Sequence, residues 1–185
     1  MTTFPVHTTE SAPDSARGPL EALQGAFGFV PNVAGVMAGS PPLVNSFFSA
    51  FGQFRGAGTF SPAERQVLLL SNAVANDCAW AVAFHSLEAL LDGVDPDAVE
   101  ALRRRELPDD PRLAALSTLT RALIDNRGHL GEGDVKAFTE AGFSGSQVLE
   151  VITGVAISTM TNHAANVARP PLEPQIGGHA WTGGY

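Results

Sequence analysis

The sequence is poor in cysteine and in basic residues, and each shortage excludes a class of protein. Cys78 is the only cysteine among 185 residues, so no disulfide can form within the chain, and a reducing cytoplasm is the expected location. Lys and Arg number 11 against 19 Asp and Glu, which gives a formal net charge of −8. This charge disfavours nucleic acids and anionic membranes as partners, because both attract basic surfaces.

Several other signatures are missing as well. No stretch approaches the roughly 18 apolar residues of a membrane span, and the polar N-terminal segment lacks the apolar core of a signal peptide. The five histidines are scattered without HxH or HxxxH spacing, so we expect no metal site. Glycine-rich phosphate-binding loops and the GxSxG serine motif are absent, and we expect no bound cofactor.

Signals for helix starts run along almost the whole chain. Capping-box patterns begin at Ser61 and Ser144, and Ser-Pro or Asp-Pro pairs precede apolar runs at 40–41, 95–96 and 110–111. No segment alternates apolar and polar residues as a strand does. The chain is therefore predicted to be all-α, with a helical-bundle core of about seven or eight helices and no significant β-sheet.

The organisation along the chain suggests one domain between two irregular ends. Residues 18–168 hold the helical patterns, and the hydrophobic share of 44% suits a single packed core. Residues 1–17 are expected to form a flexible or clasping arm. Residues 169–185, rich in Pro and Gly, are expected to form an extended tail that packs on its own body or on a neighbouring subunit.

The stretch NDCAWAVAFH, residues 76–85, holds the lone cysteine and a histidine seven residues later. Asn76 and Asp77 favour a helix break, which would put Cys78 in the first turn of a new helix that runs to about Leu91. The helix dipole there favours a thiolate, and the negative charge of Asp77 opposes it. His85 would lie two turns away, about 10 Å along the axis, so the pair needs a substrate or water between them. A small buried cysteine and a hydrogen-bonded core histidine are the simpler reading.

Several stretches carry a resemblance to a known family. They are FGFVPN at 27–32, SPAERQ at 61–66, CAWAVAFH at 78–85 and TNH at 161–163. Over roughly residues 20–181 the chain resembles the alkylhydroperoxidase D (AhpD)-like, carboxymuconolactone decarboxylase superfamily, in its peroxidase-related branch. The third stretch fits the family's C-x-x-C-x-x-x-H signature except at Ala81.

The resemblance implies an AhpD-like helical fold, a homo-oligomer (trimer or hexamer) and thiol redox chemistry. In redox-active members, two cysteines cycle through a disulfide while a histidine and a glutamate relay protons. Carried over, the first cysteine is Cys78, the histidine is His85, the second cysteine falls on Ala81 and the glutamate on Gln66. Without a second thiol the intramolecular dithiol cycle cannot run, so an external thiol reductant would be required.

Two further residues are candidates for the same pocket. His163 lies on the apolar face predicted for the last long helix, where it is either hydrogen-bonded structure or a group that reaches the Cys78 pocket, within the subunit or across an interface. Trp80 stands between the two signature positions and is expected to shape the pocket by packing.

Three functions remain open at this level. The first is a peroxidase-type thiol oxidoreductase in which Cys78 attacks a hydroperoxide and His85 transfers protons. The second is a cofactor-free acid–base enzyme (decarboxylase, isomerase or dehydratase) acting on a small organic acid or lactone, with His85 and His163 as bases. The third is a non-catalytic small-molecule binder on the same scaffold.

Overall fold

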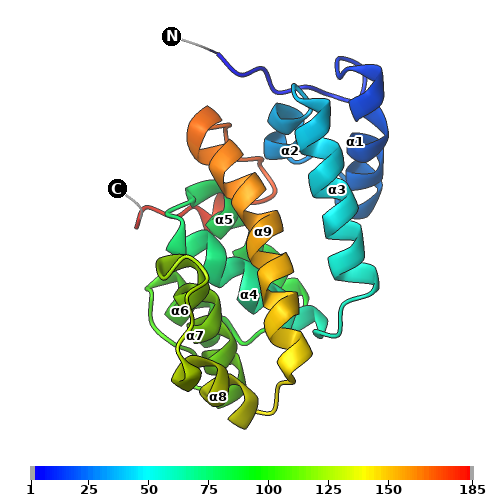
Figure 1. Cartoon of the computed structure of the whole chain (residues 1–185). Coiled ribbons are helices and arrows are strands. Elements are labelled where there is room, and N and C mark those ends of the chain that lie inside the picture. Colours follow the sequence, from blue (N-terminus) through cyan, green and yellow to red (C-terminus); the bar gives the residue numbers. More distant parts are fainter. Residues whose placement is uncertain (1–2, 184–185) are drawn as a thin grey trace.

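The structure, a computed structural model, describes residues 3–183, and these form nine α-helices and one short 3₁₀ helix without any β-strand (Figure 1). Residues 1–2 of the expected arm and 184–185 of the expected tail lie outside the described residues. The elements are α1 (Asp14–Phe27), α2 (Asn32–Met37), α3 (Pro41–Gly56), α4 (Pro62–Ala75), α5 (Ala79–Leu91), α6 (Pro96–Arg103), α7 (Pro111–Asp125), α8 (Glu132–Glu140), α9 (Gly145–Ala168) and η1 (Gly177–His179).

The predicted all-α class is confirmed, and the capping signals explain where several helices begin. Ser61 and Glu64 form a reciprocal capping box at the start of α4, and Ser144 and Gln147 form another at the start of α9. The helix count exceeds the predicted seven or eight because α1 and α2 lack a side-chain cap that a sequence could reveal. The expected arm boundary at residue 17 falls inside α1.

Helix α4 is the centre of the molecule. Every residue from Gln66 to Val74 is buried, because α4 packs against α5, α7 and α9 at once. Figure 1 shows α9 crossing in front of α4, with α1 to α3 on one side and α6 to α8 on the other. The approach of α9 to α4 is close at Gly154, where an added Cβ atom would lie 2.5 Å from Leu68 Cδ2.

Both chain ends pack on the body of the same subunit. In the N-terminal segment, the backbone N–H of His7 donates to the carbonyl of Gly35, with 3.1 Å between N and O. In the tail, Ile176 and Trp181 are buried, and the indole N–H of Trp181 donates to the carbonyl of Arg103 at 3.0 Å. None of the described helices is long and apolar enough to cross a membrane.

Candidate active site

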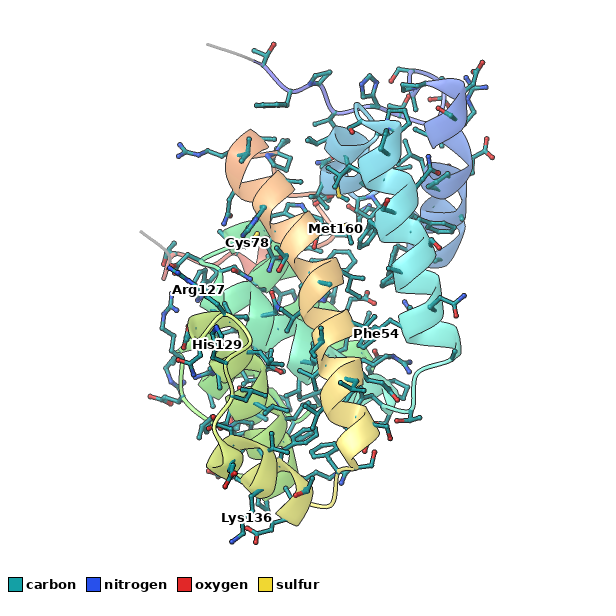
Figure 2. All side chains as sticks on the ribbon, viewed as in Figure 1. Phe54, Cys78, Arg127, His129, Lys136 and Met160 are labelled. Atoms are coloured by element: carbon teal, nitrogen blue, oxygen red, sulfur yellow. The ribbon has the colours of Figure 1, made fainter. Side chains whose placement is uncertain are left out.

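The junction between α4 and α5 places Cys78. The predicted helix break is present: Asp77 adopts a left-handed conformation with φ of 50°, which a short polar side chain tolerates better than a bulky one. Cys78 is the N-cap residue of α5 and stands just before the first helical turn. Its backbone N–H donates to the carbonyl of Ala73 at 3.0 Å, and Arg105 pairs with the Asp77 carboxylate. Figure 2 labels Cys78 at this junction, which is also tied to α9 because the Asn166 side chain donates to the Asn76 carbonyl at 2.9 Å.

The thiol of Cys78 is fully buried, and burial decides its protonation. Removal from water raises the pKa of Cys78 to about 11, although the backbone N–H groups of Ala81 and Trp80, at the start of α5, act in the opposite direction. The helix N-terminus therefore stabilises a thiolate as expected, but desolvation is the larger effect. At neutral pH the resting group is a thiol.

His85 is the start of a hydrogen-bonded chain that ends on a carboxylate. Its Nδ1 lies 3.1 Å from Gln66 Oε1, and Gln66 Nε2 donates to Asp92 Oδ2 at 2.9 Å. A carboxylate only accepts, so this contact fixes the orientation of the Gln66 amide and leaves its oxygen towards His85. The ring must then carry its proton on Nδ1, and Nε2 is left as the hydrogen-bond acceptor.

The imidazole of His85 is neutral. Burial lowers the pKa of His85 to about 3, because the imidazolium form would lose its hydration. The pKa of the nearby Glu88 is raised, chiefly by burial and then by the charge of Asp92, with Arg55 acting in the opposite direction. His85 keeps a partly exposed edge that lines a cavity.

This cavity is apolar, and side chains from α1, α2, α3, α4, α5 and α9 line it. The cavity volume is about 50 Å³, measured as the space that the centres of water-sized spheres can occupy. This is enough for a few solvent molecules or one compact ligand. Phe84 is the centre of its aromatic wall, with ring centroids 5.2 Å from Phe27 and 5.0 Å from Trp80. The polar side chains in the wall are His85, Ser158 and Thr161, together with the indole of Trp80.

The C-terminal tail holds one wall of the cavity. Glu173 is a buried carboxylate that accepts from the indole N–H of Trp80 at 2.9 Å and from the backbone N–H of Asn32. The Asn32 side chain donates in turn to the carbonyl of Pro171 at 3.0 Å. The tail therefore fixes both the Trp80 indole and the end of the FGFVPN stretch.

The structure brings together some of the sequence-predicted residues. Gln66, Trp80 and His85 meet at or directly behind the cavity wall. Cys78 and Ala81 are fully buried and are not part of the wall, although the Trp80 backbone N–H contacts the thiol.

His163 is not near the other candidates. It is exposed and lines a separate apolar groove with Phe4 and His7. The inward face of α9 carries Ser158 and Asn162, and each helical step turns by about 100°, so residue 163 points away from it. Among the described residues no group of three or more His, Cys, Asp or Glu side chains could hold a metal ion.

Three residues of the site were not predicted. Asp92 lies just beyond the predicted helix end at about Leu91 and was not considered a site residue, yet it follows His85 by two helical turns, a spacing that could have indicated a shared face. Ser158 lies four residues before Asn162 on the inward face of α9. Glu173 stands in a Pro-rich tail, where no local pattern marks it.

The comparisons with known proteins fit this architecture. Residues 41–122, from α3 into α7, match the model of the carboxymuconolactone decarboxylase family. No curated protein matches the sequence significantly.

Solved structures match nearly the whole chain. An uncharacterized peroxidase-related protein with an alkylhydroperoxidase AhpD core, from Ralstonia eutropha JMP134, has a TM-score of 0.82 and 22% identity, covering 94% of this chain and 93% of that chain. A peroxidase-related protein from Silicibacter sp. TM1040 has a TM-score of 0.78 and 20% identity, covering 96% and 94%. A variant of the debrominase Bmp8 in complex with 2,3,4-tribromopyrrole has a TM-score of 0.78 and 16% identity, covering 97% and 95%. The chain therefore has the AhpD-like fold, and residues 41–122 match the carboxymuconolactone decarboxylase family model.

Proposed function

We propose that the protein is a thiol oxidoreductase that reduces small apolar hydroperoxides, with Cys78 as nucleophile and His85 as the proton-transfer group. The observation that carries this proposal is the chain from His85 through Gln66 to Asp92, which ends at an apolar cavity. The same helix, α5, begins at a buried thiol whose pKa the backbone N–H groups of Ala81 and Trp80 lower, against the larger effect of burial. A nucleophile and a base oriented by a third group are the usual parts of such a site.

The reaction balances with one thiol and one hydroperoxide. Cys78 is buried and is not part of the cavity wall, so the reaction requires a local movement that brings its sulfur to the bound hydroperoxide. The sulfur then attacks the terminal oxygen, the O–O bond breaks, and the products are a Cys78 sulfenic acid and an alcohol. The thiol proton moves to His85 Nε2 and from there to the leaving alkoxide oxygen. One external thiol then converts the sulfenic acid into a mixed disulfide and water, and a second releases Cys78 and an external disulfide.

The protonation states restrict the timing of the proton transfer. Thiol and imidazole are both neutral at rest, and His85 with a pKa of about 3 is too weak a base to deprotonate the thiol in a separate step. The thiol proton must therefore move while the S–O bond forms and the O–O bond breaks, and it is then given up readily to the leaving oxygen. Cys78 and His85 are seven residues apart on one helix, so the proton must cross about 10 Å through the bound substrate and water. Trp80 joins the two regions, because its side chain lines the cavity and its backbone N–H contacts the sulfur.

Similar proteins support the proposal at the level of the scaffold. Two of them are described as peroxidase-related. The debrominase complex with tribromopyrrole supports a compact, largely apolar ligand for this fold. We also retain the homo-oligomer, a trimer or hexamer, as a proposal that sedimentation of the purified protein would test.

The experiment follows consumption of tert-butyl hydroperoxide with dithiothreitol as the external thiol. We expect Cys78→Ser to abolish turnover and His85→Ala to lower it by about 100-fold, within the usual range for a lost acid–base group. His129→Ala is the matched control, because His129 is exposed and far along the chain from the cavity residues, and it should retain full activity. Turnover that survives Cys78→Ser would refute the thiol mechanism.

A further inference from the structure

Ser158 brings an unpaired hydroxyl to the apolar cavity. Its side chain is only 2% exposed, and its Oγ has no hydrogen-bond partner among the described residues. A serine or threonine inside a helix commonly donates to the carbonyl four residues earlier, as Ser86 does to Val82 at 2.6 Å and Thr159 does to Val155 at 2.8 Å. Ser158 makes no such bond. A buried polar group without a partner is costly, so a polar atom of a bound ligand would complete it.

His85 presents the complementary group on the opposite helix of the same cavity. Its Nδ1 is committed to Gln66, so the free nitrogen, Nε2, accepts a hydrogen bond. Ser158 can donate through its hydroxyl. A ligand that satisfies both must carry a head group with one donor and one acceptor.

Charge restricts the ligand further. Among the described residues, the wall of this cavity contains no Lys, Arg, Asp or Glu side chain, and its titratable group is the neutral His85. Arg55 and Arg65 line a smaller adjoining pocket that shares Phe84 and His85, where Glu88 is also present. A carboxylate placed in the cavity would lose its hydration without meeting a cation, and it would face an Nε2 lone pair that cannot donate. A neutral hydroxyl or hydroperoxide has neither problem.

We propose that Ser158 and His85 together select neutral ligands with an O–H head on a compact apolar body, and that the cavity rejects carboxylates. This inference rests on the proposed hydroperoxide reductase function and names its specificity. The O–H of a hydroperoxide donates to His85 Nε2, and one of its oxygens accepts from Ser158 Oγ. Ser158 is a specificity-determining residue in this arrangement.

The test compares two ligands with the same body, tert-butanol and pivalate, at pH 7 in the Cys78→Ser background. Each ligand is added stepwise, and binding is measured from the NMR chemical shifts of the His85 imidazole. We expect saturable shifts with tert-butanol and none with pivalate over the same concentration range. Ser158→Ala should weaken tert-butanol binding by roughly five- to tenfold, the effect of one lost neutral hydrogen bond, while Ser158→Thr, which keeps the hydroxyl, should bind within about twofold of the parent.

A second readout separates binding from folding. Ser158→Ala should leave the Tm of the free protein unchanged or higher, because it removes an unpaired group. The matched control is Ser71→Ala, another buried helical serine, whose Oγ donates to Ser117 Oγ at 2.8 Å. It should lower Tm and leave tert-butanol affinity unchanged. Equal binding of pivalate and tert-butanol, or unchanged affinity in Ser158→Ala, would overturn the inference. Since tert-butanol cannot be reduced, head-group selection without hydroperoxide turnover would refute only the proposed function.

Discussion

The two proposed catalytic side chains, Cys78 at the N-cap of α5 and His85 within α5, differ in their exposure to solvent, and burial shifts their pKa values in opposite directions. Cys78 caps the helix inside the protein core, and its thiol pKa rises to about 11. His85, two turns later, turns an edge to a cavity, and its imidazole pKa falls to about 3. In both cases the charged form is the one that burial disfavours.

The comparison indicates that the Cys78 thiol and the His85 imidazole are both uncharged near neutral pH when no substrate is bound. A thiolate–imidazolium pair would require two desolvated charges, and only backbone N–H groups and an amide are in place to stabilise them. The proposed mechanism therefore requires that substrate binding, rather than a charged resting state, starts the reaction.

The largest expected effect concerns the Cys78 end. At pH 7 a bulky disulfide reagent should react with Cys78 in the folded protein at least about 100-fold more slowly than in the unfolded chain, because the thiolate fraction falls with the raised pKa and the sulfur is inaccessible. Reaction with Ellman's reagent in buffer and in denaturant measures this ratio. Equal rates would show that the thiol is open to solvent.

The His85 end should appear in the pH dependence of stability. The pKa of His85 in the folded protein lies below its unfolded value of 6.5, so protonation of the unfolded chain favours unfolding at low pH. The contribution of the neutral His85 to the free energy of unfolding is therefore complete above pH 6.5 and is lost as pH falls towards 3. The loss should be at most about 1.4 kcal/mol per pH unit, and smaller where water in the cavity hydrates the ring. Urea unfolding between pH 4.5 and 7 measures it. In His85→Gln, which removes the titrating group, this part of the slope should disappear.

Substitutions at Gln66 test the hydrogen bonds that connect His85 to Asp92. Gln66→Leu leaves His85 Nδ1 and Asp92 without their partner, so we expect a loss of about 2 kcal/mol in stability and a lower turnover. Gln66→Glu places a second carboxylate beside Asp92, and the charge next to the ring should raise the pKa of His85 by about 1–3 units. Titration of the imidazole by NMR reports that shift. An unchanged pKa would mean that Gln66 does not contact the ring in solution.

The smallest effect is expected at His163. His163→Ala should change stability by less than about 0.5 kcal/mol and leave hydroperoxide turnover unchanged, because the side chain is exposed on the outer groove of α9. A loss of turnover would indicate that His163 contributes to the active site of a neighbouring subunit.

Much of the fold was predictable because its signals are local. The capping boxes at Ser61 and Ser144, and the break before Cys78, need only neighbouring residues, and the structure has all three. The site was predictable in part: Gln66, Trp80 and His85 came from a motif resemblance. Ser158 and Glu173 reach the site through tertiary packing, from residues 73 and 88 positions beyond His85, and no pattern in one sequence marks such contacts. The direction of the Cys78 pKa also depended on burial, which outweighed the helix dipole.

The most direct test of the account is the pH profile of Cys78 oxidation by tert-butyl hydroperoxide, with the sulfenic acid trapped and followed by mass spectrometry. Between about pH 5 and pH 10 the thiol and His85 keep their neutral forms, so transfer of the thiol proton to His85 predicts a nearly constant rate in the parent protein. His85→Ala can react only through the thiolate, and its rate should rise about tenfold per pH unit. A parent profile that rises in parallel with that of His85→Ala would contradict the proposed proton transfer, because the two groups would then act independently.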